Sequence, residues 1–463
     1  MIKTRFPDSF WTMEPATGAE PAFSTTWQII GYLPSGRQVH FLLIFLPFFR
    51  SIQARLREPG RARLVGLMPD IRTPAEEHRE EIARLLARAL NAPLERVLNR
   101  SPNLALEDFR CAFVDGRVVA CAAEYHFFQW FGGRPVPCSG IFAVATLPEH
   151  REAGLASAAM AQIMSEARRR GDPLTALYPA VLRPYRRLGY EIAGTFTEHR
   201  LPLDVLPNTG HRPAVEALEI GRDLEGVKEC YRAWVCNHNG PVEPVGDEWW
   251  TRRIFDGSNE ETFAAVAVRE GRTLEGYAAF RREPDPGTLD MEFGLNCSAL
   301  VATTEPAMRT LLSYFRGYRG IGRWMEWSGP PQEPIALLIP EQHLIRRLTY
   351  PWMLRLLDVP GALRERGWPR IEAEAVIAVE DPMFSENAGP WRLRVSGGEA
   401  SVEPATGGET PNPIPVGALS SMFSGYLKVS DAVRLGFFGA EDPAVPALAQ
   451  LLAGPDPWSP VFF

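Results

Sequence analysis

The chain has 463 residues, of which 45% are hydrophobic and 23% charged, and its formal net charge is −7. This length exceeds what a single hydrophobic core usually supports, so we expect about three domains of ordinary globular composition. The acidic balance gives no reason to expect a nucleic-acid partner.

The spacing of the cysteines and histidines bears on whether the chain has disulfides or a metal site. The six cysteines form no C-x-x-C pair, and the eight histidines form no H-E-x-x-H or H-x-H cluster. We therefore expect no disulfide framework, no metal site and a cytoplasmic location. The apolar run at 41–49 is interrupted by Pro47 and is too short to span a bilayer, so no stable membrane insertion is expected.

Residues 1–62 differ in composition from the rest of the chain, because a single apolar segment is followed by a series of arginines. One interpretation is an anchor at a membrane surface. The other is sequence upstream of a natural start near Leu64 or Met68. We expect this N-terminal extension to be poorly ordered or over-read.

Residues 63–207 show the pattern of a mixed α/β domain. Apolar spacing predicts a helix at 74–91, and two strands flank the Asp115-Gly116 turn within 113–123. Strands are also predicted at 138–146 and 174–178, and a strand at 195–203 would close the sheet.

An elbow between a strand and a helix is the most informative feature. The apolar run Ile141–Thr146 leads through a turn to Gly154, and a helical stripe follows at positions 155, 156, 159, 160, 163, 164 and 167. Three arginines and Gly171 end that helix. Bare amides at the start of a helix, beside small residues, predict a phosphate seat. The arginines at 168–170, 183, 186 and 187 have the right sign for a phosphate-rich ligand, although a solvated helix face explains them equally well.

Two further α/β units follow the first. Residues 213–345 predict helices at 223–234, 248–254 and 305–318 and strands at 263–268, 275–281 and 289–293, without a second elbow. Residues 350–463 predict a strand at 372–380, a hairpin at 391–402 and helices at 416–426, 432–435 and 444–452.

From about residue 63 to the end, the chain resembles the enhanced intracellular survival (Eis) group of GNAT acetyltransferases. The resemblance rests on VATLPEHREAGL at Val144–Leu155, PYRRLGY at Pro184–Tyr190, WMLRLLDVPGALRERGW at Trp352–Trp368 and an aromatic C-terminus. It implies tandem GNAT-like mixed sheets flanked by helices, the second without a cofactor site, and a C-terminal sterol-carrier-protein-like domain. It also implies a homohexamer that acetylates small-molecule amines or lysine side chains with acetyl-CoA.

The family's cofactor contacts carry over residue by residue. They fall on Val144, Ala145 and Thr146 of the strand, on Ala180 and Val181, and on the turn residues Arg151, Glu152, Ala153, Gly154, Leu155, Ala156 and Ser157. The family usually has Ser-Glu where this chain has Ala180-Val181, and its run of arginines is thinned to Arg-Glu-Ala here. These departures predict weaker cofactor binding.

The same resemblance assigns the catalytic groups. Tyr185 matches the family's proton donor, because a phenol keeps its proton at neutral pH and can release it to a leaving thiolate. The base is the terminal carboxylate, which here belongs to Phe463 and would dock into the first domain. The aromatic residues Phe127, Phe128, Trp130 and Phe131 are candidates for the acceptor pocket.

Two other functions remain open at this point. The chain could be a lipid- or sterol-binding protein acting through its C-terminal domain, although Trp391, Leu419, Met422 and Phe423 are expected to fill that domain. It could also be a scaffold with a decayed acetyltransferase site.

Overall fold

The structure is a computed structural model that describes residues 3–6, 9–15, 26–32, 38–44, 70–100, 105–208, 215–255, 262–285, 291–407, 411–439 and 441–462. The chain divides into two compact units, Met1–Met68 and Pro69–Phe463. The first unit holds an antiparallel sheet of β1 (Lys3–Phe6), β2 (Ser9–Pro15), β3 (Thr26–Tyr32) and β4 (Gln38–Ile44). The sequence pattern did not predict these four strands.

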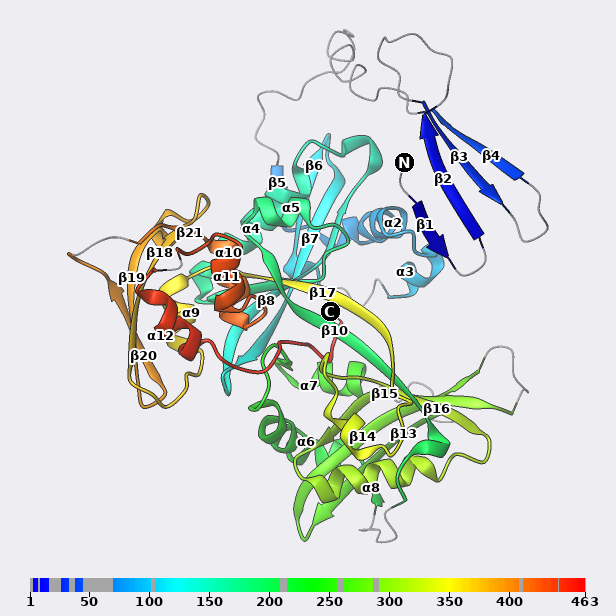
Figure 1. Cartoon of the computed structure of the whole chain (residues 1–463). Coiled ribbons are helices and arrows are strands. Elements are labelled where there is room, and N and C mark those ends of the chain that lie inside the picture. The colour runs from blue at the N-terminus through cyan, green and yellow to red at the C-terminus, as the bar shows by residue number, and fades with distance from the viewer. Residues whose placement is uncertain are drawn as a thin grey trace. The chain divides into compact units, whose positions relative to one another are not determined.

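One long mixed sheet organises the second unit (Figure 1). Its order begins β11-β13-β14-β15-β16-β10 and continues β17-β9-β8-β7-β6-β5, and β12 (Val242–Pro244) pairs with β7. The strand bounds in that order are Val215–Ala217, Phe263–Glu270, Thr273–Pro284, Phe293–Ala302, Gly322–Ser328, Glu191–Pro202, Ile345–Leu356, Leu174–Leu177, Arg134–Thr146, Arg117–Phe131, Phe109–Val114 and Asp70–Arg72.

Two predictions about strands are wrong. The strand predicted at 195–203 belongs to β10, which does not close the sheet, because β17 pairs along one of its edges and β16 along the other. The strand predicted at 289–293 overlaps the observed β15 only at Phe293, where β15 begins, and residues 289–290 lie outside the described residues. Long-range pairing explains the place of β10, because β17 comes from much later in the chain and fits between β9 and β10.

The first domain carries its helices as the sequence predicts. The helix predicted at 74–91 comprises a short 3₁₀ turn (Glu76–His78) and α2 (Arg79–Ala89), which α3 (Leu94–Arg100) follows. Helix α4 (Leu155–Arg170) buries six of the seven predicted stripe residues, Leu155, Ala159, Met160, Ile163, Met164 and Ala167, whereas Ala156 is only partly buried. The short α5 (Arg183–Arg187) follows β9.

The second domain repeats this plan. Helix α6 (Ile220–Val235) packs on β14 and β15, and α8 (Glu305–Arg316) packs on β13, β14 and β15. Between them lie α7 (Asp247–Trp249) and a π-helical turn at Trp250–Ile254.

The C-terminal domain has its own four-stranded sheet of β20 (Glu399–Pro404), β19 (Gly389–Ser396), β18 (Ala373–Glu380) and β21 (Ile414–Pro415). Its helices are α9 (Val359–Glu365), α10 (Val416–Ser424), α11 (Val429–Arg434) and α12 (Ala444–Leu451). Leu419, Met422 and Phe423 are buried as expected, in a core that also contains Phe131 of β7. The first and last domains therefore share one hydrophobic core.

Candidate functional site

Strands β8 and β9 separate at the point where the sequence predicts the cofactor strand. They pair in parallel from Cys138–Leu174 to Ile141–Leu177, where β9 ends, whereas β8 continues to Thr146. Among the described residues, Val144, Ala145 and Thr146 therefore have no strand partner on that edge. An extended ligand such as a pantetheine arm can add to such an edge by backbone hydrogen bonds.

A bulge marks the point of separation. Ala143 has a φ of +49°, in the left-handed region that L-residues seldom occupy, and the register with β7 is irregular between Cys121 and Ala123. The thiol of Cys121 donates to the Ala143 carbonyl oxygen at 3.3 Å. A bulge twists and bends its strand, so this irregularity directs the end of β8 away from the line of β9.

The elbow after β8 has the features expected of a phosphate seat. Gly154 precedes α4 with a φ of +76°, no side chain caps the helix, and its first turn carries no acidic residue. A Cβ at Gly154 would meet nothing within 4 Å, so the space beside the backbone is open. Arg151, Glu152 and Ala153 are exposed, whereas Leu155 is buried and fixes the first turn of the helix. Unpaired amides there present partial positive charge to an anion.

The corresponding helix of the second domain has the opposite chemistry. The Thr304 hydroxyl caps α8 by accepting from the Ala307 amide at 3.3 Å. Glu305 adds a negative charge to the first turn, and the Thr304 hydroxyl donates to the Glu275 carboxylate at 3.0 Å. A phosphate at this helix start would meet a satisfied amide and two carboxylates, and the absence of a cofactor site from this domain stays a prediction.

Tyr185 lies on α5 and is 8% exposed. Its ring meets Tyr190 edge to face at 6.4 Å, within the apolar cluster that contains Met160 and Ile163 of α4. Burial, and to a lesser extent the nearby Tyr350, raises the pKa of Tyr185 above its usual value near 10. The phenol is therefore protonated at neutral pH, as a proton donor must be.

The last described residues reach the same region. The Tyr178 hydroxyl donates to the Val461 carbonyl oxygen at 2.9 Å, and the Phe462 ring stacks on Tyr178 at 4.2 Å. Phe462 also meets Tyr350, whose hydroxyl donates to the Pro179 carbonyl oxygen. The C-terminal segment thus contacts the loop that joins β9 to α5. Phe463 itself lies outside the described residues.

The remaining predicted residues are more dispersed. Ala180 and Val181 are exposed in the loop between β9 and α5, and Val181 is 61% exposed. Of the four aromatic candidates for an acceptor pocket, Phe127, Trp130 and Phe131 are buried in hydrophobic cores. Sequence reasoning missed Tyr178 and Tyr350, because only their tertiary contacts with Phe462 distinguish them from core tyrosines.

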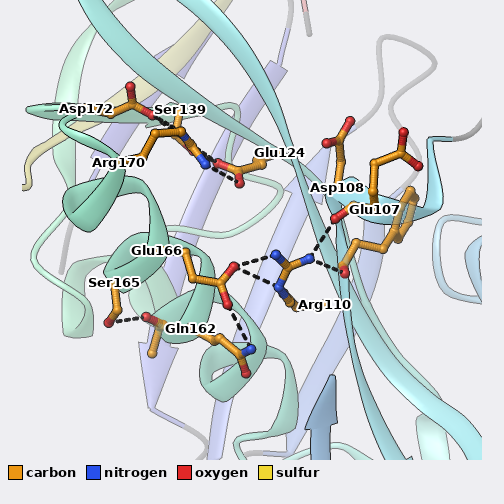
Figure 2. Close-up of polar contacts among 12 residues, drawn as sticks. Glu107, Asp108, Arg110, Glu124, Ser139, Gln162, Ser165, Glu166, Arg170 and Asp172 are labelled. Carbon is orange, nitrogen blue, oxygen red and sulfur yellow. Dashed lines mark hydrogen bonds and ion pairs between the residues drawn. The ribbon is translucent and has the colours of Figure 1, made fainter. Parts of the chain in front are cut away.

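Arg170 at the C-terminal end of α4 and Arg110 of β6 are paired with carboxylates within the protein. Arg170 contacts the buried Glu124 at 2.9 Å and Asp172 at 2.6 Å, and the Ser139 hydroxyl donates to Glu124, as Figure 2 shows. Figure 2 also shows Arg110 of β6 bonded to Glu166 of α4. These contacts fix α4 against the sheet behind the elbow. The basic end of α4 therefore holds the helix against the sheet, and the predicted phosphate seat is at the other end of the helix.

Two kinds of feature are absent from the described part of the chain. No group of three or more His, Cys, Asp or Glu side chains gathers there as a metal site. No helix in the same residues is both long and apolar enough to cross a membrane.

Comparisons with known proteins agree with this architecture. Residues 70–193 and 246–356 match two families, each described as an acetyltransferase (GNAT) domain, and residues 359–460 match a sterol carrier protein domain. An uncharacterized N-acetyltransferase of Streptomyces griseus is 26% identical over 409 residues, which cover 80% of this chain and 92% of that protein. N-acetyltransferase Eis of Mycobacterium tuberculosis is 26% identical over 293 residues, covering 58% and 68%. The crystal structure of a GCN5-related N-acetyltransferase from Anabaena variabilis superposes with a TM-score of 0.77 at 25% identity, covering 86% of this chain and 100% of that one.

The fold and the split strand pair define the class of this protein, which is an N-acetyltransferase of the GNAT family. The order of its domains assigns it to a group within that family. Two GNAT domains followed by a sterol carrier protein domain make it an Eis-like member of that family.

Proposed function

We propose that this protein transfers the acetyl group of acetyl-CoA to a primary amine of a small molecule or a lysine side chain, by direct attack in a ternary complex. The observation that carries the proposal is the separation of β8 from β9 at Ala143, which leads to an uncapped helix start at Gly154. Strand edge and elbow together fit a ligand with a peptide-like arm and a diphosphate. Val144–Thr146 and Arg151–Ser157 would hold that ligand, and Ala180 and Val181 would offer only backbone contacts.

The chemistry needs three proton movements. An amine with a pKa near 10.4 is almost entirely protonated at pH 7, so a base must take its proton before it attacks the thioester carbon. As the C–N bond forms and the C–S bond breaks, the leaving sulfur takes a proton from the Tyr185 phenol. The nitrogen then gives up its second proton, which leaves a neutral amide and restores the phenol through water. The terminal carboxylate of Phe463 is the proposed base, directly or through water.

Calorimetric titration with acetyl-CoA tests the first part of this proposal. We expect saturable heat with one site per chain, because only α4 of the two corresponding helices has an uncapped, acid-free start. Absence of heat would favour a scaffold with a decayed site.

A thiol-release assay over a panel of amines tests the second part. Adding a single glycine after Phe463 removes the carboxylate from its place and is expected to abolish turnover while acetyl-CoA still binds. Unchanged turnover would refute the role of the carboxylate.

Assembly and location are also proposals. By resemblance to the Eis group we propose a homohexamer in the cytoplasm. Sedimentation velocity would show a species of about six chains, and a monomer would contradict this.

A second candidate function is lipid or sterol binding. A groove of about 800 Å³ lies between the α5–β10 region and the C-terminal domain, lined by apolar residues that include Ile192, Val416, Leu427 and Phe437. This volume suits a small amphiphile. Titration with a single-chain fatty acid below its micelle concentration would give saturable binding, and absence of binding would remove this candidate.

A further inference from the structure

The turn that follows α6 holds the C-terminal segment by the backbone. The Trp458 amide donates to the Asn239 carbonyl oxygen at 3.0 Å, and the Asn239 side-chain amide donates to the Pro455 carbonyl oxygen at 3.4 Å. Asn239 is 3% exposed. These hydrogen bonds are therefore shielded from water.

The same turn is bonded to the first domain. The Gly132 amide, in the turn between β7 and β8, donates to Asn239 Oδ1 at 2.9 Å. The Gly240 amide donates to the Trp130 carbonyl oxygen at 2.7 Å. Asn239 and Gly240 thus bond to the C-terminal segment and to the sheet that carries the cofactor strand, and they fix one against the other.

Gly240 allows this close approach because it has no side chain. A Cβ there would lie 2.6 Å from the Trp458 carbonyl oxygen and 2.9 Å from Cζ2 of Trp352. Trp458 is 1% exposed, and its ring meets Trp234 edge to face at 5.8 Å. Any side chain at position 240 would have to displace the C-terminal segment or Trp352.

Thr195 of β10 fixes the register of the segment. Its amide donates to the Pro457 carbonyl oxygen at 3.2 Å, and the Ser459 amide donates to its carbonyl oxygen at 2.9 Å. A slip of one residue would move the chain end by about 3.3 Å and reverse the direction of every side chain. Phe463 follows Trp458 by five residues, a reach of about 17 Å, so this register limits where Phe463 can lie.

We propose that Asn239 and Gly240 form a clasp that sets the position of the last residue and that both are positioning residues for acetyl transfer. This inference rests on the proposed function, in which the terminal carboxylate is the base. In this proposal the second GNAT domain takes part in catalysis, because it presents the turn that holds the base. The start of its own α8 suits no phosphate.

The test compares two glycines that differ in one respect. Gly240 and Gly246 both have positive φ, +98° and +84°, but a Cβ at Gly246 meets nothing within 4 Å. Gly240→Ala is expected to lower kcat about tenfold to a hundredfold, because misplacing a catalytic group by about 1 Å can cost that much. KM for acetyl-CoA should stay within about twofold. Gly246→Ala, which also places an alanine at positive φ, should keep wild-type kcat, and equal kcat values for the two variants would overturn the clasp.

A measurement independent of turnover is the rate at which a carboxypeptidase removes Phe463, followed by mass spectrometry. Gly240→Ala should release the residue at least several-fold faster than Gly246→Ala, and equal rates would contradict the proposal. Asn239→Asp, which replaces the donor to Pro455 by an oxygen, gives the same test if Gly240→Ala does not fold.

Failure of the clasp can be told apart from failure of the proposed base. If the glycine extension after Phe463 leaves turnover unchanged, the base is wrong. If the extension abolishes turnover and Gly240→Ala does not reduce it, the base stands and the clasp is wrong.

Discussion

The Tyr185 phenol combines burial with a location between α4 and the loop that contacts the C-terminal segment. Replacing it by Phe keeps the ring and its packing and removes only the hydroxyl group, and with it the transferable proton. We expect Tyr185→Phe to lower kcat by about 10²-fold or more, the range for loss of a general acid, with acetyl-CoA affinity near normal. Thiol release and calorimetry measure the two quantities.

Tyr190→Phe is the matched control for that variant. Tyr190 is 1% exposed, its ring packs beside Tyr185, and its hydroxyl bonds to that of Thr175 at 2.9 Å. Its loss should cost about 1–2 kcal/mol of stability and little activity. Parallel loss of turnover and cofactor affinity in Tyr185→Phe would instead assign Tyr185 to structure.

His238 makes the seat of the C-terminal segment sensitive to acid. Burial lowers the pKa of His238 to about 4, and Trp458 Nε1–H donates to its Nδ1 at 3.4 Å. In the unfolded chain the imidazole pKa is near 6.5, so the unfolded state takes up the proton first. The contribution of His238 to stability is therefore complete above about pH 6.5 and is lost as the pH falls toward 4.

This shift predicts up to about 3 kcal/mol of acid destabilisation from His238 alone. Urea unfolding at several pH values, compared with that of His238→Gln, isolates the contribution, because glutamine does not titrate. If the free energy of unfolding depends on pH in the same way in both proteins, His238 does not cause the acid destabilisation.

At the scale of elements, α4 has a left-handed glycine at each end. Gly154 and Gly171 have φ of +76° and +101°, and a Cβ at either would meet nothing within 4 Å. Alanine at either position should therefore cost a similar backbone strain of about 1–2 kcal/mol. Only Gly154→Ala is expected to weaken acetyl-CoA binding, by about tenfold, because only that end receives the phosphates.

Calorimetric titration measures the acetyl-CoA affinity of both variants, and thermal unfolding measures their stability. Equal affinities in Gly154→Ala and Gly171→Ala would mean that the conformation at Gly154 is not needed for binding. The elbow would then have to be reassigned as a structural turn.

The elements differ in how far the sequence could predict them. The stripe of α4 is visible as local periodicity, and Gly154 and Gly171 mark its limits, so this helix was predicted almost to the residue. The segment from residue 350 was predicted to open the third domain, yet residues 350–356 belong to β17 of the long sheet. The pairing partners of β17, Glu191–Ile192 and Leu174–Leu177, lie more than 150 positions earlier in the chain, beyond the reach of any local pattern.

At the scale of the whole molecule, a buried ion pair joins the long mixed sheet to the C-terminal domain. Arg355 of β17 is 0% exposed and contacts Asp381, which is 4% exposed, at 2.8 Å. Asp381 also accepts from the Asn387 side chain and from the Met383 and Phe384 amides. The charges of this junction are paired within the protein, so removing one partner leaves a buried charge.

Asp381→Ala is expected to destabilise the protein by about 3–5 kcal/mol, the usual cost of breaking a buried pair. Asp431→Ala removes the exposed partner of Arg434 and should change stability by less than about 1 kcal/mol. Urea unfolding of both variants measures the two changes in the free energy of unfolding. Similar values for the two variants would show that the Arg355 site is hydrated rather than sealed.

The sequence alone determined what short-range physics encodes: the strand, turn and helix of the elbow, the six buried positions of α4, and the amphipathic segments of all three domains. Tertiary structure alone decided which strands pair, how Tyr178 and Tyr350 meet Phe462, and how Asn239 bonds to Trp458. The reason is physical, because a backbone conformation is set by neighbours a few residues away. The choice of a partner depends instead on which distant surfaces the complete fold brings into contact.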